Sequence, residues 1–247
     1  MRIHLITPIV TEGIRTLDDI AAFNSADLSI TQSLIATGPA SIESEFDEAM
    51  SVPGIVAEAI AAERSGADAI IIDCMGDPGL NAAREVVSIP VLGPSETSMH
   101  LAAMLGHKYS VVTVLDSVIP MIENLAKIYG TSEKLVSVRA IDIPVLELEA
   151  APERLIAELA TASVAAVEED GAHAIVLGCT GFLGCAEGIT AALESKNYNL
   201  PVIDPIPSTA CVAAGIVRAG LTHSKRTYAQ PRSKDLKGYP SIKIQGE

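Results

Sequence analysis

The sequence is poor in aromatic residues. Its 247 residues include no tryptophan, and aromatic residues make up only 3% of the chain, although apolar residues make up 49%. The core must therefore be built mainly from Ala, Val, Ile and Leu, a composition that favours parallel strands covered by helices. A chain of this length is expected to form one large α/β domain or two lobes of about 100–125 residues each.

Other features are also missing, and each absence excludes a class of protein. No apolar run approaches the roughly 18–20 residues of a membrane span. The four cysteines lack paired C-x-x-C spacing and the five histidines are scattered, so no metal site is predicted. There is neither a G-x-G-x-x-G motif nor a Walker loop. The net charge of -14 argues against nucleic acid or an anionic membrane as a partner.

The N-terminal stretch "RIHLITPIV" resembles a strand rather than a secretory signal. It lacks a charged n-region, a long h-region and a small-residue cleavage site. We therefore expect a cytoplasmic protein whose cysteines are reduced thiols.

Strand-like and helix-like runs alternate along almost the whole chain. The expected strands are 3–9, 28–35, 69–73, 90–93, 110–115, 135–141, 174–178 and 201–204. The expected helices are 14–23, 53–65, 80–87, 95–105, 117–129, 152–170, 185–195 and 208–219. The acidic stretch "EFDEAM" (45–50) is interpreted as a solvated loop or a helix entry. Each half is then a fourfold (βα) repeat, which predicts parallel sheets with helices on both faces.

The two halves of the sequence also share identical residues at corresponding positions. "GADAIIIDCMGD" (66–77) and "GAHAIVLGCTGF" (171–182) agree at six of twelve positions, and "PVLGP" (90–94) later matches "PVIDP" (201–205). The pattern predicts a duplicated α/β fold with two pseudosymmetric lobes, each a four-stranded, mainly parallel sheet flanked by helices. Lobe 1 is expected to span 1–97 plus 207–247 and lobe 2 to span 98–206, with an active site in the cleft between them.

The repeat places Cys74 and Cys179 at equivalent strand ends. Ligands of open α/β sheets bind at the carboxyl ends of the strands. Backbone N–H groups at a helix start favour a thiolate, and the amides of "CMG" and "CTG" could hold a developing oxyanion. Two such thiols on opposite faces of one carbon would form a two-base racemase or epimerase that needs no cofactor.

Other polar and thiol residues receive smaller roles. Cys185 and Cys211 have no counterpart in the other half and are interpreted as packing thiols. Asp73 should point away from Cys74 along the strand. Asp77 and Thr180 lie in the loops after the cysteines and could touch substrate, although Asp77 could equally cap the following helix.

These motifs together resemble the aspartate/glutamate/hydantoin racemase superfamily over nearly the full length, and within it the hydantoin racemase branch. The resemblance rests on "ADAIIIDCMGDPGL", "AIVLGCTGF", "PVLGPSE" and "PVIDP". It implies two α/β lobes, no metal or other cofactor, a small-molecule substrate and a homo-oligomer. Amino-acid racemases of the superfamily usually carry Asn-Thr after the first cysteine, where this chain has Met75-Gly76.

Carried over to this chain, the resemblance makes Cys74 and Cys179 the acid/base thiols. It implies that backbone amides bind the substrate carbonyls. The implied substrate-binding residues are Pro8, Ile9, Met75, Gly76, Thr180, Gly181 and Phe182. One departure is clear: Thr7-Pro8-Ile9 stands where hydantoin and allantoin racemases typically have Asn-Pro-Asn.

Three functions remain open on the sequence alone. The first is a racemase of 5-monosubstituted hydantoins. The second is another carbon-acid enzyme on the same scaffold: an allantoin racemase, an Asp or Glu racemase, or an isomerase of a small dicarboxylate. The third is a two-lobed protein that only binds a small molecule, with structural thiols.

Overall fold

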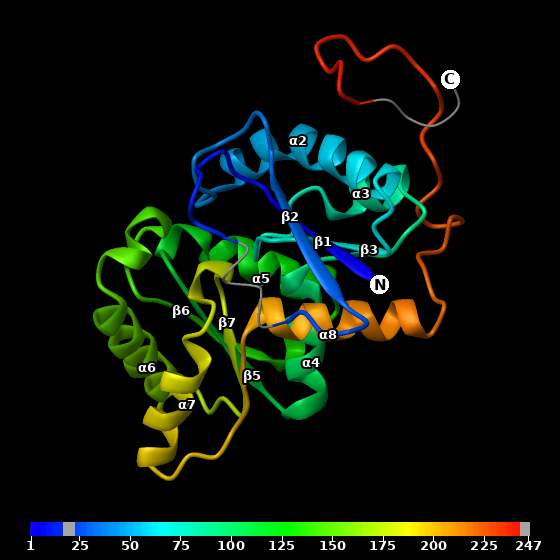
Figure 1. Ribbon diagram of the computed structural model, residues 1–247. Helices are drawn as coiled ribbons and strands as arrows, with labels where there is room; N and C mark the ends of the chain where they lie inside the picture. The colour runs from blue at the N-terminus through cyan, green and yellow to red at the C-terminus, as the bar shows by residue number, and fades with distance from the viewer. Residues whose placement is uncertain (17–22, 243–247) are drawn as a thin grey trace. The chain divides into compact units, whose positions relative to one another are not determined.

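The computed structural model describes residues 1–16 and 23–242, and its chain forms two compact units. The first unit comprises Met1–Gly93 and Thr209–Glu247, and the second comprises Pro94–Ser208. Figure 1 shows the helices and strands of both units.

The first unit contains a parallel sheet in the order β2-β1-β3-β4. Its strands are β1 (Arg2–Thr7), β2 (Ser29–Leu34), β3 (Ala69–Ile72) and β4 (Val91–Leu92), and its helices include α2 (Glu45–Arg64) and α3 (Leu80–Val86). All four residues of β3 are buried, as expected for a parallel strand that is covered on both faces. Ile55 and Ala59 of α2 and Ala83 of α3 pack in one core cluster with Ile70 and Ile72 of β3.

The second unit repeats this topology, with a parallel sheet in the order β6-β5-β7-β8. The strands are β5 (Tyr109–Thr113), β6 (Leu135–Ala140), β7 (Ile175–Leu177) and β8 (Val202–Ile203). The helices include α4 (Pro94–Leu105), α5 (Ile119–Ile128), α6 (Pro152–Glu168) and α7 (Ala186–Ser195), and α8 (Pro205–Arg218) begins here. Helix α6 packs with α7, and α4 packs with α5 (Figure 1). The predicted fold class, two four-stranded parallel sheets flanked by helices, is confirmed.

One expected helix begins well after the start that the structure gives it. Helix α2 begins at Glu45 rather than near Pro53, because Ser44 caps it: the Asp47 N–H donates to Ser44 Oγ at 3.2 Å. A side-chain cap of this kind satisfies an otherwise unpaired N–H in the first turn. The acidic stretch is therefore a helix entry, one of the two interpretations. The helix expected at 14–23 lies mostly in 17–22, outside the described residues.

The segment after α8 lies against α3 and β4 in the first unit. Lys225 Nζ donates to the Arg84 and Glu85 carbonyls at 2.7 and 3.2 Å. A lysine here interacts favourably with the negative end of the α3 dipole. In the described part of the chain, no helix is long and apolar enough to cross a membrane.

Candidate active site

Cys74 lies just beyond the carboxyl end of β3 and is partly exposed. The Asp73 N–H donates to the Ile6 carbonyl at 2.8 Å and closes the pairing with β1. The chain then turns, because the Asp77 N–H donates to the Cys74 carbonyl at 3.1 Å. Within this turn the Gly76 N–H donates to Cys74 Sγ at 3.4 Å. The thiol therefore sits at the carboxyl edge of the sheet with a backbone amide directed at its sulfur.

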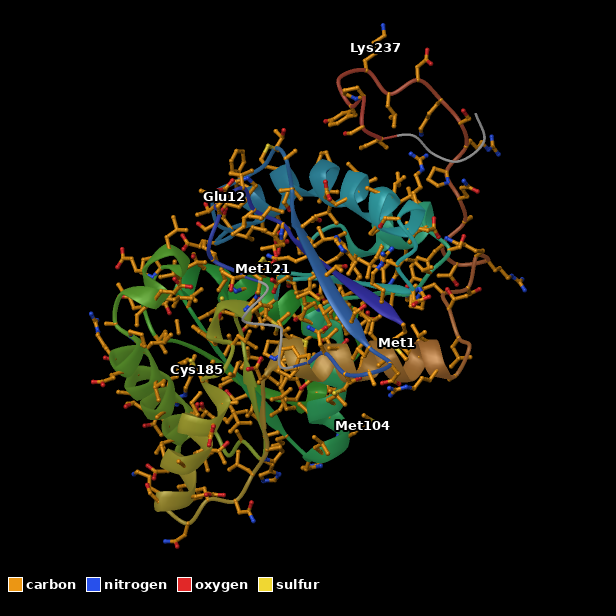
Figure 2. All side chains as sticks on the ribbon, in the orientation of Figure 1. Met1, Glu12, Met104, Met121, Cys185 and Lys237 are labelled. Atoms are coloured by element: carbon orange, nitrogen blue, oxygen red, sulfur yellow. The ribbon has the colours of Figure 1, made fainter. Side chains whose placement is uncertain are left out.

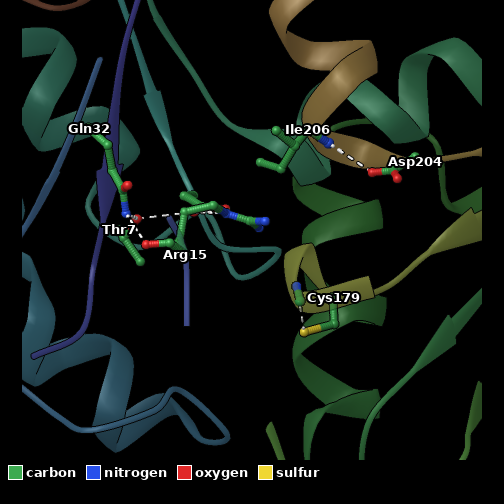
Figure 3. Close-up of polar contacts among 8 residues, drawn as sticks. Thr7, Arg15, Gln32, Cys179, Asp204 and Ile206 are labelled. Carbon is green, nitrogen blue, oxygen red and sulfur yellow. Dashed lines mark hydrogen bonds and ion pairs between the residues drawn. The ribbon is translucent and has the colours of Figure 1, made fainter. Parts of the chain in front are cut away.

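Cys179 occupies the equivalent position after β7 and is also partly exposed. The Gly178 N–H donates to the Val112 carbonyl at 2.6 Å, and the Phe182 N–H donates to the Cys179 carbonyl at 3.1 Å. The Gly181 N–H donates to Cys179 Sγ at 3.3 Å (Figure 3). The hydrogen bonds of the first cysteine loop are thus repeated in the second unit.

The amide contacts to sulfur have a chemical consequence. A hydrogen bond donated to the charged form of an acid stabilises that form, so each of these amides would stabilise a thiolate formed at its cysteine. A thiolate can take a proton from a carbon next to a carbonyl group. The amides of Gly76 and Gly181 were expected to bind a substrate carbonyl, and in this structure both are directed at sulfur. Their contact with substrate remains a prediction.

A buried ion pair fixes the residue that precedes Cys74. Arg15 Nε and Nη2 donate to Asp73 Oδ2 and Oδ1 at 2.9 and 3.2 Å, and their side chains are 5% and 1% exposed. Thr7 Oγ1 donates to the same carboxylate at 3.1 Å. Gln32 Nε2 donates to Thr7 Oγ1 and to the Arg15 carbonyl, both at 3.1 Å (Figure 3). The loop after β1 is therefore tied to the strand end that carries Cys74.

This ion pair was missed in the sequence. The available signal was an acidic residue directly after a fully buried strand, since a buried charge requires a partner. The partner was not identifiable, because Arg15 lies in a loop far from Asp73 in the chain and follows no spacing rule.

A second carboxyl group lies behind the Cys74 loop. Glu48, in the first turn of α2, has its Oε1 sealed from solvent, and this atom has no hydrogen-bond partner among the described residues. A Cβ built on Gly76 would lie 1.5 Å from that oxygen. Burial, followed by the charges of Glu45 and Asp77, raises the pKa of Glu48 to about 8. Glu48 was missed in the sequence because the stretch 45–50 was interpreted only as a solvated loop or a helix entry.

Asp77 is buried and does not cap α3. The residue before α3 is Gly79, which has a left-handed backbone and no side chain with which to cap the helix. The Asp77 carbonyl accepts the Leu80 N–H at 3.2 Å, whereas its carboxyl packs on Gly93, where a Cβ would lie 2.4 Å away. The helix-cap interpretation of Asp77 is therefore wrong, because Gly79 holds that position.

The predicted substrate-binding residues follow the two sheets. Pro8 and Ile9 continue from β1, which pairs with β3, so they lie at the same sheet edge as Cys74 and Met75. Met75 is 4% exposed and Phe182 is 0% exposed, so both side chains are buried. Thr180 begins the short 3-10 turn after Cys179. Each unit thus gathers its own share of the predicted residues around its own cysteine.

The other two cysteines differ from one another. Cys185 is buried beside the start of α7 (Figure 2), and burial, together with the charge of Asp204, raises the pKa of its thiol. This fits a packing role. Cys211 was also expected to be a packing thiol, and that prediction is wrong, because its side chain is exposed. It lies on the outward stripe of α8, which it shares with the exposed Gly215 and Arg218.

Within residues 1–16 and 23–242, no group of three or more His, Cys, Asp or Glu side chains could hold a metal ion.

Comparison with known proteins agrees with this geometry. The model of the Asp/Glu/Hydantoin racemase family matches residues 10–213. The chain belongs to the Asp/Glu/hydantoin racemase family. It is 40% identical over 241 residues to a hydantoin racemase of Pseudomonas sp. (strain NS671), which covers 96% of this chain and 95% of that protein. A hydantoin racemase of Rhizobium meliloti is also 40% identical, over 97% of this chain and 98% of its own length.

A solved structure of the racemase family shows the same fold. Allantoin racemase from Klebsiella pneumoniae superposes with a TM-score of 0.89 and 33% sequence identity, covering 96% of each chain. The family membership predicted from the two cysteine motifs is thereby confirmed.

Proposed function

We propose that this chain is a cofactor-independent racemase of 5-monosubstituted hydantoins, in which Cys74 and Cys179 are the two acid/base groups. The observation that carries the proposal is the pair of matching loops, each with a partly exposed thiol that accepts a glycine N–H. The full-length similarity to proteins named hydantoin racemases supports the choice of substrate.

The chemistry of the ring suits a thiolate. The C5 hydrogen of a hydantoin lies beside a ring carbonyl, and its removal gives an enolate that is spread over a planar ring. A thiolate is a sufficient base if hydrogen-bond donors stabilise the enolate oxygen. A free amino acid carries a carboxylate next to its Cα, which makes that hydrogen much less acidic.

Racemisation by two bases assigns one thiol to each face of the carbon. One cysteine, as the thiolate, takes the C5 proton, and the other, as the thiol, returns a proton to the opposite face. The proposal therefore requires that both sulfurs reach the same carbon. The groups proposed to hold the ring are Pro8, Ile9, Met75 and Gly76 of the first unit and Thr180, Gly181 and Phe182 of the second.

Allantoin racemisation is the second candidate, favoured by the structural similarity to an allantoin racemase. Allantoin is a hydantoin with a ureido group at C5, so the same thiol chemistry would apply to it. The two candidates differ only in the group that the pocket accepts at C5.

A polarimetric screen separates these functions. Pure L- and D-forms of several 5-substituted hydantoins, allantoin, aspartate and glutamate are incubated with the enzyme after dialysis against a chelator. We expect loss of optical rotation with hydantoins from both enantiomers. Loss with allantoin alone would favour the second candidate, and loss with aspartate or glutamate alone would overturn both.

The proposal extends to the state of the protein. We infer a cytoplasmic homo-oligomer that acts on a small molecule and binds neither nucleic acid nor a membrane, an inference supported by the family resemblance and the net charge of -14. Light scattering coupled to size exclusion tests the oligomer directly: a mass of about 25.7 kDa, that of one chain, would contradict it.

A further inference from the structure

The Glu48 carboxyl fills the space in which a side chain at position 76 would stand. Its Oε1 would overlap a Cβ on Gly76, at 1.5 Å, and its carboxyl carbon would lie 2.7 Å from that atom. Real Cβ atoms do not approach other atoms so closely, so a side chain at position 76 would require the Glu48 carboxyl to move aside. The contact lies entirely within the first unit.

The same glycine connects Glu48 to the thiol. The Gly76 N–H donates to Cys74 Sγ at 3.4 Å, and the Cα of Gly76 rests on the carboxyl group. The Glu48 carboxyl therefore packs against the same residue whose amide faces the sulfur. The backbone of Glu48 is held in the first turn of its helix, since its N–H donates to the Ser44 carbonyl at 3.1 Å.

The charge state of Glu48 matters for the same sulfur. Glu45 on its own helix and Asp77 in the cysteine loop are the charged groups that act on it, and both are acidic. With burial, they raise the pKa of Glu48 to about 8, so the group is an uncharged carboxylic acid at neutral pH. Ionised, it would bring a third negative charge to a loop that already holds Asp77 and must carry the Cys74 thiolate.

We propose that Glu48 is a positioning residue for Cys74: its carboxyl packs against Gly76, whose amide faces the sulfur, and a negative charge on it opposes formation of the Cys74 thiolate. The two ionisations then compete, because an anion at Glu48 disfavours an anion at Cys74. The inference rests on the proposed function only in taking Cys74 as the thiol that acts on substrate. The competition between the two groups can be measured without any substrate.

Alkylation by iodoacetamide tests the competition directly. The rates at Cys74 and Cys179 are measured by peptide mass spectrometry in the same samples between pH 6 and pH 10. Replacing Glu48→Gln keeps the shape and removes the ionisation. We expect the midpoint of the Cys74 profile to fall by about 0.5–1 pH unit, whereas the Cys179 profile stays unchanged.

Glu45→Gln is the matched control, because Glu45 is exposed on the same helical turn. Its effect on the Cys74 midpoint should be clearly smaller than that of Glu48→Gln. Superimposable Cys74 profiles in Glu48→Gln and the parent would overturn the proposal, as would equal shifts at Cys74 and Cys179.

The steric part of the proposal is tested by rescue. Gly76→Ala places a methyl group against the carboxyl and should slow alkylation of Cys74 at pH 7 about tenfold or more. The double variant Gly76→Ala, Glu48→Ala provides the missing space and should recover most of that rate. A double variant as slow as Gly76→Ala would contradict the packing argument.

These readouts separate the two proposals. If Glu48→Gln shifts the midpoint of Cys74 alkylation but the protein racemises none of the tested compounds, the role of Glu48 is supported and the proposed function is contradicted. If the protein racemises hydantoins but Glu48→Gln leaves the Cys74 alkylation profile unchanged, the proposed function is supported and the role of Glu48 is contradicted.

Discussion

The two cysteine loops share their hydrogen bonds and differ in what lies behind the glycine. Behind Gly76 stands the titratable Glu48 carboxyl, whereas behind Gly181 stands Leu148, whose Cδ1 would lie 2.8 Å from an added Cβ. Both groups occupy the space that a side chain at the glycine would need, but a methyl group cannot ionise. The two loops therefore share their geometry, but only the reactivity of Cys74 is expected to respond to the ionisation of a neighbouring carboxyl group.

The residue before each cysteine shows a second difference. Asp73 is held by the buried ion pair with Arg15. At the matching place is Gly178, where a Cβ would lie 2.8 Å from Val111 and 2.9 Å from Thr113. One strand end is fixed by charge and the other by close packing of the backbone. Similar positions of the two sulfurs thus arise from different interactions. A substitution can therefore disturb one cysteine loop and leave the other unchanged.

The largest expected effect removes either thiol. Cys74→Ser and Cys179→Ser should each reduce racemisation by at least about 10³-fold, because an alcohol is far too weak an acid/base group at neutral pH. Chiral chromatography of each pure hydantoin enantiomer measures the loss. A variant of either cysteine that still racemises at close to the parent rate would break the equivalence of the two loops.

Arg15→Ala should damage the Cys74 loop alone. It leaves Asp73 buried without its cation, which typically costs about 3–5 kcal/mol of unfolding free energy. Urea unfolding measures the loss, and alkylation should change at Cys74 but not at Cys179.

Arg139→Ala is the matched control in the second unit. Its ion pair with Asp170 is partly exposed, at 27% and 22% of the side chains, so its loss should cost no more than about 1 kcal/mol. Equal costs for the two variants would contradict the distinction between a buried and a solvated pair.

The Glu48 carboxyl predicts a pH dependence of stability. Folding raises its pKa from 4.5 to about 8, so the folded protein keeps a proton that the unfolded chain has lost. Stability therefore falls as pH rises through this window. Glu48→Gln removes the effect: its Tm should match the parent near pH 4.5 and exceed it by about 2–6 °C at pH 9. A constant Tm difference across this range would argue against a buried neutral Glu48.

The smallest effects are expected from the cysteines outside the two loops. Cys185→Ser and Cys211→Ser should each leave racemisation within a few-fold of the parent, as measured by loss of optical rotation. Replacing the buried Cys185 should lower the free energy of unfolding. Replacing the exposed Cys211 should change it by no more than about 0.5 kcal/mol. A large loss of turnover in either variant would mean that the thiol chemistry is not confined to Cys74 and Cys179.

The repeated phrases around Cys74 and Cys179 were sufficient to predict the strand ends, the fold class and the family, because buried parallel strands and glycine-bearing loops leave clear local patterns. The sequence predicts α2 from Pro53, whereas the helix begins at Glu45 because Ser44 and Asp47 form the cap.

The missed residues depend on contacts between distant segments. Arg15 reaches Asp73, and Glu48 reaches Gly76, through the packing of the loop after β1 and of α2. No spacing rule connects these residues in the sequence. The position of the Glu48 carboxyl, half-buried against the cysteine loop, becomes visible only when the helix is placed against that loop.

Deuterium exchange in the single cysteine variants tests the two-thiol account most directly. A hydantoin that the parent enzyme racemises is supplied as each pure enantiomer and incubated in deuterated water with Cys74→Ser or Cys179→Ser. The reaction is followed by NMR and chiral chromatography. The remaining thiol should exchange the C5 hydrogen of one enantiomer with retention of configuration, and the two variants should act on opposite enantiomers. Exchange of the same enantiomer by both variants would contradict the assignment of one thiol to each face.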